Sequence, residues 1–171
     1  MFLKRNERGK KMKDKLFTLL DSCIANGTEN DITAITHFLE VLQTKINVGK
    51  RSFIDQFFHM DSKLDENSCE ITIPLNPVLN NSFDIVHGGI TATLLDTAMG
   101  TLANYLLPKG YGAVTNQLNI HYIAPGIGES LRCNAEIIHQ GNKTLVVTGE
   151  VHRDDGKKIA YATGTFFVIK K

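Results

Sequence analysis

The sequence has few cysteines and no long apolar run. Its three cysteines, Cys23, Cys69 and Cys133, are odd in number, widely spaced and without a CxxC pair, which argues against a disulfide framework or a zinc site. A reducing cytoplasm is the simplest location for such a chain. No run approaches the roughly 18 apolar residues of a membrane span, so we expect no membrane-spanning segment and no membrane partner.

The chain also lacks a large net charge. Its 171 residues include 19 Lys and Arg against 18 Asp and Glu, a net charge of +1, so no global field marks a nucleic-acid-binding protein. Basic residues are concentrated only in the first fifteen positions, which we interpret as a solvated, frayed terminus. This length, with 42% apolar residues, allows one domain with a sizeable core and a small appendage.

Residues 1–52 are predicted to form an N-terminal helical extension. From about Met12 to Val48 apolar residues recur at helix spacing, and Asn26-Gly27 interrupts the pattern. We therefore expect two short amphipathic helices. Gly49-Lys50-Arg51 closes this part, and the remaining chain, residues 53–171, changes character.

Residues 53–171 are predicted to form an α+β fold. The apolar segment 85–107 reads as a helix buried by a sheet, because it is apolar on nearly every side. Strand-like segments flank it, and the turns between the last four suit antiparallel hairpins. The expected strands are 57–60, 69–74, 113–123, 129–140, 144–153 and 158–169. These elements together predict an antiparallel sheet wrapped around one long helix.

A His-Gly-Gly turn, His87-Gly88-Gly89, opens this helix, and Asp96 is the acid that it carries. Glycines at a helix start let a ligand approach the backbone closely, and the unpaired N–H groups there attract a developing negative charge. Alone, the turn could be purely structural and the acid a satisfied buried group. Together, at this spacing, they favour a functional site.

The segment 53–171 resembles the hotdog-fold acyl-CoA thioesterases, in the PaaI-like branch named for the phenylacetate-degradation thioesterase. The resemblance rests on His87-Gly88-Gly89, on Asp96 nine residues after the histidine, on Asn81 six residues before it, and on the segment 114–125. It implies hydrolysis of an acyl-CoA to a carboxylic acid and free coenzyme A, without metal or cofactor. It also implies a homo-oligomer, either a dimer or a dimer of dimers.

The resemblance also implies roles for single residues. The Gly88 N–H would hold the oxyanion, and Asp96 would act as nucleophile or as the base that activates water. Asn81 would orient water or the substrate carbonyl, Thr115 would position water beside the acid, and His87 would brace the turn rather than carry protons.

Three further residues are expected to contact substrate: Gly89 beside the oxyanion position, and Lys143 with Thr144 in a turn that resembles one touching coenzyme A in relatives. Lysines beside turns are more often simply solvated. Arg153, Lys157 and Lys158 are further candidate cations for the phosphates of coenzyme A.

The spacing of Gly88 and Asp96 predicts a shared site. If both lie on one continuous helix, eight residues separate their backbones by about 12 Å. One chain cannot readily supply both groups to one carbonyl, so we expect Gly88 of one subunit to face Asp96 of the other across a two-fold interface.

Two alternatives remain open at this point. A non-catalytic acyl-CoA sensor could use the basic N-terminal helices on DNA or a partner, although these helices show no clear helix-turn-helix pattern. Dehydration of a hydroxyacyl thioester is less favoured, because the spacing of the histidine and the acid does not suit it. The length and aromaticity of the acyl group cannot be read from the sequence.

Overall fold

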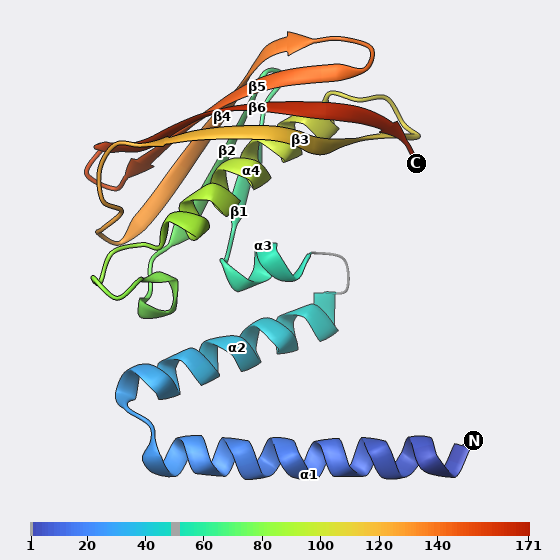
Figure 1. Cartoon of the computed structure of the whole chain (residues 1–171), viewed down its shortest axis with the longest axis vertical. Coiled ribbons are helices and arrows are strands. Elements are labelled where there is room, and N and C mark those ends of the chain that lie inside the picture. The colour runs from blue at the N-terminus through green and yellow to red at the C-terminus, as the bar shows by residue number, and fades with distance from the viewer. Residues whose placement is uncertain (1, 49–51) are drawn as a thin grey trace. The chain divides into compact units, whose positions relative to one another are not determined.

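The computed structural model describes residues 2–48 and 52–171 (Figure 1). The chain forms two compact units, Met1–Phe53 and Ile54–Lys171. The first unit is helical and the second contains all the strands of the described chain.

The first unit is a pair of helices, α1 (Phe2–Asn26) and α2 (Glu29–Val48). The prediction of two short helices was wrong about their lengths, and the expected frayed start is helical from Phe2, because that segment contains no proline. The break at Asn26-Gly27 is confirmed. After it, Thr28 and Asp31 cap α2 reciprocally: the Asp31 carboxylate accepts from the Thr28 N–H at 2.8 Å, and the Thr28 hydroxyl accepts from the Asp31 N–H at 3.3 Å.

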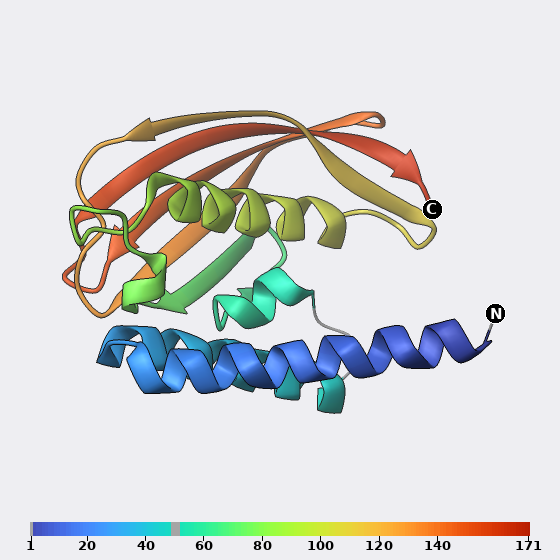
Figure 2. The same ribbon diagram turned by 60° about the horizontal axis from the view of Figure 1, so that its bottom comes forward.

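The second unit is an antiparallel six-stranded sheet that curls around one long helix, α4 (Gly88–Tyr105), as Figure 2 shows. The strand order is β1-β2-β4-β5-β6-β3, so β3 is an edge strand. The strand bounds are β1 Asp61–Leu64, β2 Ser68–Pro74, β3 Tyr111–Tyr122, β4 Ser130–Gln140, β5 Thr144–Arg153 and β6 Lys158–Lys170. The predicted α+β architecture is confirmed.

The core lies between α4 and the concave face of the sheet. Along β2 and β5 every second residue is buried, the alternation expected of strands with one face covered. Gly149 lets the helix approach closely, because a Cβ there would lie 2.9 Å from Leu95 and 3.2 Å from the Met99 sulfur. At the end of the helix, the Asn104 side chain accepts from the Ala113 N–H at 3.0 Å and donates to its carbonyl at 3.1 Å, joining α4 to the start of β3.

The predicted strand at residues 57–60 was wrong. Phe57 ends a short helix, α3 (Phe53–Phe57), and the chain then turns. The Met60 N–H donates to Asp55, and His59 adopts a left-handed backbone with φ of 47°, which closes a helix end and cannot continue a strand. The strand expected there is β1, which begins at Asp61. His59 is therefore not a strand residue, whereas His121, His139 and His152 lie in strands as predicted.

We expect Phe166→Ala to lower the free energy of unfolding by about 3–5 kcal/mol, because it removes a large aromatic ring from a closed core. Phe166 is 0% exposed, and its ring packs directly against Gly100 and Gly164. Its neighbour Phe167 is 47% exposed and supplies a matched control, for which we expect a loss of about 1 kcal/mol or less. Urea unfolding followed by circular dichroism measures both, and equal losses would contradict the assignment of the core.

Two cysteines are expected to resist alkylation in the folded protein. Burial raises the pKa of the Cys69 thiol to about 11, and burial together with Cys69 raises the pKa of Cys133 further. The reactive thiolate of Cys69 is therefore only about a thousandth of the population at pH 8. Iodoacetamide at pH 8 should leave both unmodified, and urea should expose them; rapid labelling of the native protein, read by mass spectrometry, would contradict this.

The raised pKa values of Cys69 and Cys133 make the free energy of unfolding depend on pH. The folded state holds these thiol protons more tightly than the unfolded chain does, so the stabilising contribution is complete below the ordinary thiol pKa near 9. It is then lost progressively as the pH rises from 9 toward the raised value for Cys69 of about 11.

Candidate active site

The His-Gly-Gly turn forms the N-terminus of α4 and leaves one backbone donor unused. His87 is the residue before the helix, and its Nδ1 accepts a hydrogen bond from the Gly89 N–H at 2.9 Å. The ring must therefore be unprotonated at Nδ1. The Gly88 N–H is one of the first helical donors, which have no acceptor within the helix, and no partner for it occurs among the described residues.

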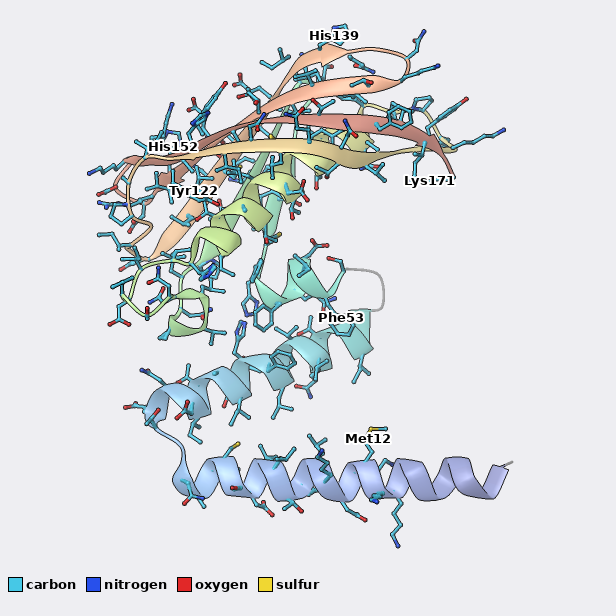
Figure 3. All side chains as sticks on the ribbon, in the orientation of Figure 1. Met12, Phe53, Tyr122, His139, His152 and Lys171 are labelled. Carbon is cyan, nitrogen blue, oxygen red and sulfur yellow. The ribbon has the colours of Figure 1, made fainter. Side chains whose placement is uncertain are left out.

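Contacts from three other segments hold the Gly88 turn in place. The Val86 N–H donates to Gly126 and the His87 N–H donates to Leu79, both at 2.9 Å. Tyr122, at the end of β3 and labelled in Figure 3, donates its hydroxyl to the Gly88 carbonyl at 2.9 Å. The sequence reasoning missed Tyr122, since 34 residues separate it from Gly88 and only the packing of β3 beside α4 brings them together.

Asp96 lies two turns into α4 and is hydrogen-bonded to Thr115. The Thr115 hydroxyl, on the edge strand β3, donates to the Asp96 carboxylate at 2.8 Å. Asp96 is half-buried and Thr115 is exposed, so the carboxylate can be reached from outside the chain. Ala92 and Gly100, one turn before and after the acid, are small and leave space beside it.

Asn81 lies in the loop before the turn. Its side-chain oxygen accepts from the Phe83 N–H at 2.8 Å, and its backbone N–H donates to Ile85, also at 2.8 Å. This is the local turn expected of an asparagine in a loop. Its side-chain NH₂ has no acceptor among the described residues, so a donor remains available at this position.

The turn Gly141-Asn142-Lys143-Thr144 joins β4 to β5 at the Thr115 end of the sheet. Thr115, Phe166 and Leu145 occupy one row across β3, β6 and β5. Two strand spacings, roughly 10 Å, therefore separate the backbones of Thr115 and Leu145.

The candidate cations differ in their pairing. Arg153 pairs with Asp155, and Lys158 pairs with Glu150. Lys143 and Lys157 have no ion-pair partner among the described side chains. Among these four cations, Lys143 and Lys157 therefore remain available for an anionic ligand.

Within one chain these residues form two groups. His87, Gly88 and Gly89 lie at the start of α4, while Asp96 and Thr115 lie together further along it. Because α4 is one continuous helix over Gly88–Tyr105, eight residues separate the Gly88 and Asp96 backbones by about 12 Å. The chain alone does not bring the Gly88 N–H and the Asp96 carboxylate to one atom.

Two kinds of feature are absent from residues 2–48 and 52–171. No helix there is long and apolar enough to cross a membrane. No group of three or more His, Cys, Asp or Glu side chains in the same residues could hold a metal ion.

Comparison with known proteins assigns the family. The model of the thioesterase superfamily matches residues 83–160, which include the turn, Asp96 and Thr115. The solved structure of the BH2602 protein of Bacillus halodurans with CoA is 38% identical, with a TM-score of 0.82, and the match covers 90% of this chain and 99% of that one. The chain belongs to the thioesterase superfamily, in its PaaI-like hotdog-fold branch.

Two curated relatives each match about half of this chain. The acyl-coenzyme A thioesterase PaaI of Escherichia coli is 29% identical over 102 residues, which cover 59% of this chain and 71% of PaaI. The medium/long-chain acyl-CoA thioesterase YigI of the same organism is 31% identical over 97 residues, covering 49% and 63%. The chain thus spans about two thirds of these relatives. The match to BH2602 covers 90% of this chain, more than the second unit alone contains, so it includes part of the helical first unit.

Proposed function

We propose that this protein hydrolyses an acyl-CoA thioester to a carboxylic acid and free coenzyme A. One observation carries the proposal: α4 begins with an unpaired Gly88 N–H and presents, two turns later, a half-buried carboxylate held by the Thr115 hydroxyl. A donor for a developing oxyanion and an oriented acid are the two groups that acyl transfer requires. The relatives PaaI and YigI are acyl-CoA thioesterases, which supports the same substrate class.

The Gly88 N–H polarises the thioester carbonyl and binds the oxyanion that forms on attack, assisted by the positive end of α4. Asp96 either removes a proton from the attacking water or attacks the carbonyl itself, giving an anhydride that water then opens. In both routes the C–S bond breaks, the thiol of coenzyme A leaves with a proton, and the acyl group gains the oxygen of water. Thr115 orients the Asp96 carboxylate, and His87 fixes the turn through Gly89.

The complete site forms between two subunits. Strand β3 lies at the edge of the sheet, where strand residues beyond Ala113 can pair with another strand, and its apolar side chains Val114 and Tyr122 are exposed. Pairing of this face with a second copy would set Gly88 of one subunit against Asp96 of the other. A two-fold pair then contains two equivalent sites.

The remaining predicted residues act on the substrate. The free NH₂ of Asn81 orients the attacking water or the carbonyl, and Gly89 leaves room beside the oxyanion position. Lys143 and Thr144, in the turn at the Thr115 end of the sheet, contact coenzyme A. Lys143, which has no ion-pair partner among the side chains that the structure describes, supplies a positive charge for a phosphate group.

Release of free thiol from short, medium, long and aromatic acyl-CoAs tests the proposal. We expect turnover of at least one class, and a loss of at least about a hundredfold in kcat/KM for Asp96→Asn, which keeps the shape of the side chain but removes the base or nucleophile. Asp61→Asn, at an exposed acid on β1, is the control and should retain wild-type activity.

A different outcome would favour the alternative function, a non-catalytic acyl-CoA sensor. Tight acyl-CoA binding by the wild type, without turnover of any member of the panel, would contradict hydrolysis. Equal activity of the wild type and Asp96→Asn would leave a hydrolase but remove Asp96 from its mechanism.

A further inference from the structure

The two helices of the first unit enclose an apolar groove that the pair alone does not close. This hairpin groove, of about 370 Å³, is lined by side chains from both helices. Its lining residues are Leu16, Phe17, Leu19, Leu20, Cys23, Ile35, Phe38, Leu39 and Leu42. Leu16, Phe17 and Leu19 remain 58%, 64% and 53% exposed, which is unusual for a contiguous set of large apolar side chains.

The spacing of these residues is that of a helical bundle. On α1, apolar positions recur at Met12, Leu16, Leu19 and Cys23, at intervals of four, three and four residues. On α2 they recur at 32, 35, 39, 42 and 46, at intervals of three and four. A repeat averaging 3.5 residues presents a continuous apolar seam to a neighbouring helix with the same repeat.

Helix α1 carries more apolar surface than one partner helix can cover. On α1, Phe17, Leu20 and Ile24 form a second seam beside the first, and Ile24 is 60% exposed. Figure 3 shows the Met12 side chain projecting from α1 on the side of α2. Helices with two adjacent seams are typical of four-helix bundles, in which each helix packs against two neighbours.

The charges of the two helices indicate what the occupant is. In the sequence of α1, Lys and Arg outnumber Asp and Glu, and in the sequence of α2 the acids are in excess. Nucleic acid or an anionic lipid surface would be attracted to α1 and repelled by α2. A second copy of the same hairpin offers an acidic helix to the basic one and a basic helix to the acidic one.

We propose that the hairpin groove binds the same hairpin of a second copy, giving a four-helix bundle in which each α1 lies beside the α2 of the partner. A two-fold axis parallel to the helices produces this order, with every pair of neighbouring helices antiparallel and of opposite charge. A perpendicular axis would instead set α1 against α1, basic against basic.

The proposed order makes a specific pair of residues neighbours. Lys15 lies eleven residues before the end of α1 and Glu40 lies eleven residues after the start of α2, so both are at the same height in an antiparallel arrangement. Lys15 precedes the groove residue Leu16, and Glu40 follows the groove residue Leu39. Neither charge has an ion-pair partner among the described side chains.

Isotope mixing tests this pairing on the full chain. Equal amounts of ¹⁵N-labelled and unlabelled protein are unfolded in urea, refolded together and treated with a carbodiimide, which joins lysines to carboxylates. We expect Lys15–Glu40 cross-links of mixed isotope, reaching about half of that product if all of it forms between chains. Cross-links of a single isotope only would overturn the proposal, even if the second unit forms dimers.

Substitutions at two adjacent positions of α1 distinguish disruption of the hairpin groove from a general effect of adding a charge to the helix. Leu19→Glu places a charge in the groove and should abolish the mixed cross-link, whereas Thr18→Glu, at a position that does not line it, should preserve the cross-link. Alkylation of Cys23, which lines the groove, should be at least about tenfold slower in the wild type than in Leu19→Glu. Equal alkylation rates, or binding of the wild type to anionic phospholipid vesicles in place of self-association, would contradict the proposal.

Discussion

Replacing Gly88 with proline is expected to lower kcat/KM for thioester hydrolysis by about a hundredfold to a thousandfold, because proline removes the N–H that would hold the oxyanion. The fold should tolerate the change. Gly88 is the first residue of α4, where proline is well accepted, and His87 has the extended backbone, φ of −60° and ψ of 135°, that a residue before proline prefers.

Gly88→Ala is the matched control. Alanine keeps the N–H, and its Cβ would meet the Tyr122 ring at 3.5 Å, an ordinary contact. We therefore expect Gly88→Ala to retain activity within about tenfold of the wild type, and both variants to unfold within a few degrees of each other. Similar losses of activity in the two variants would mean that space beside Tyr122, and not the N–H, matters at this position.

Mixing two inactive variants is expected to restore activity. If Gly88 and Asp96 of different subunits form each site, a dimer of one Gly88→Pro chain and one Asp96→Asn chain has one site with both groups intact. Random pairing makes half of the dimers mixed, so the refolded mixture should show about a quarter of wild-type activity. This recovery is at least about tenfold above either variant alone.

The same experiment distinguishes a site within one chain. If Gly88 and Asp96 of the same subunit act together, every site in the mixture carries one defect and activity stays at the level of the parents. Mixing the Asp96→Asn protein with wild type provides the control for refolding. An inactive mixture, with normal activity in the control, would contradict a site shared between subunits. The proposal of hydrolysis would then depend on the activities of the single variants.

Periodicity predicted most of the fold because the second unit is regular. Alternating burial in β5 and the continuous apolar face of α4 follow directly from residue spacing. The sequence pattern also identified Asp96 and Gly88 as candidate site residues, since an acid and glycines are unusual in an apolar helix. The family resemblance implied that Thr115 positions water beside the acid, and in the structure the Thr115 hydroxyl donates directly to the Asp96 carboxylate at 2.8 Å.

Features that depend on contacts distant in sequence were not predictable in this way. Tyr122 reaches Gly88 through the packing of β3 beside α4, which no local pattern encodes. The supposed strand at 57–60 has strand-like composition, but the left-handed backbone at His59 is fixed by its helix-closing hydrogen bonds. The sequence pattern underestimates the length of α1, because a cluster of basic residues at a terminus is typical of a frayed segment, although lysine and arginine are good helix formers.

The Asn104 amide marks where strand addition along β3 must stop. By accepting from the Ala113 N–H and donating to its carbonyl, it occupies the outer backbone groups of that residue in the way a neighbouring peptide would. An incoming strand finds these groups already taken and can pair only with the residues beyond them. One side chain thereby shortens an exposed edge and gives it a defined end, which guards the protein against unlimited edge-to-edge association.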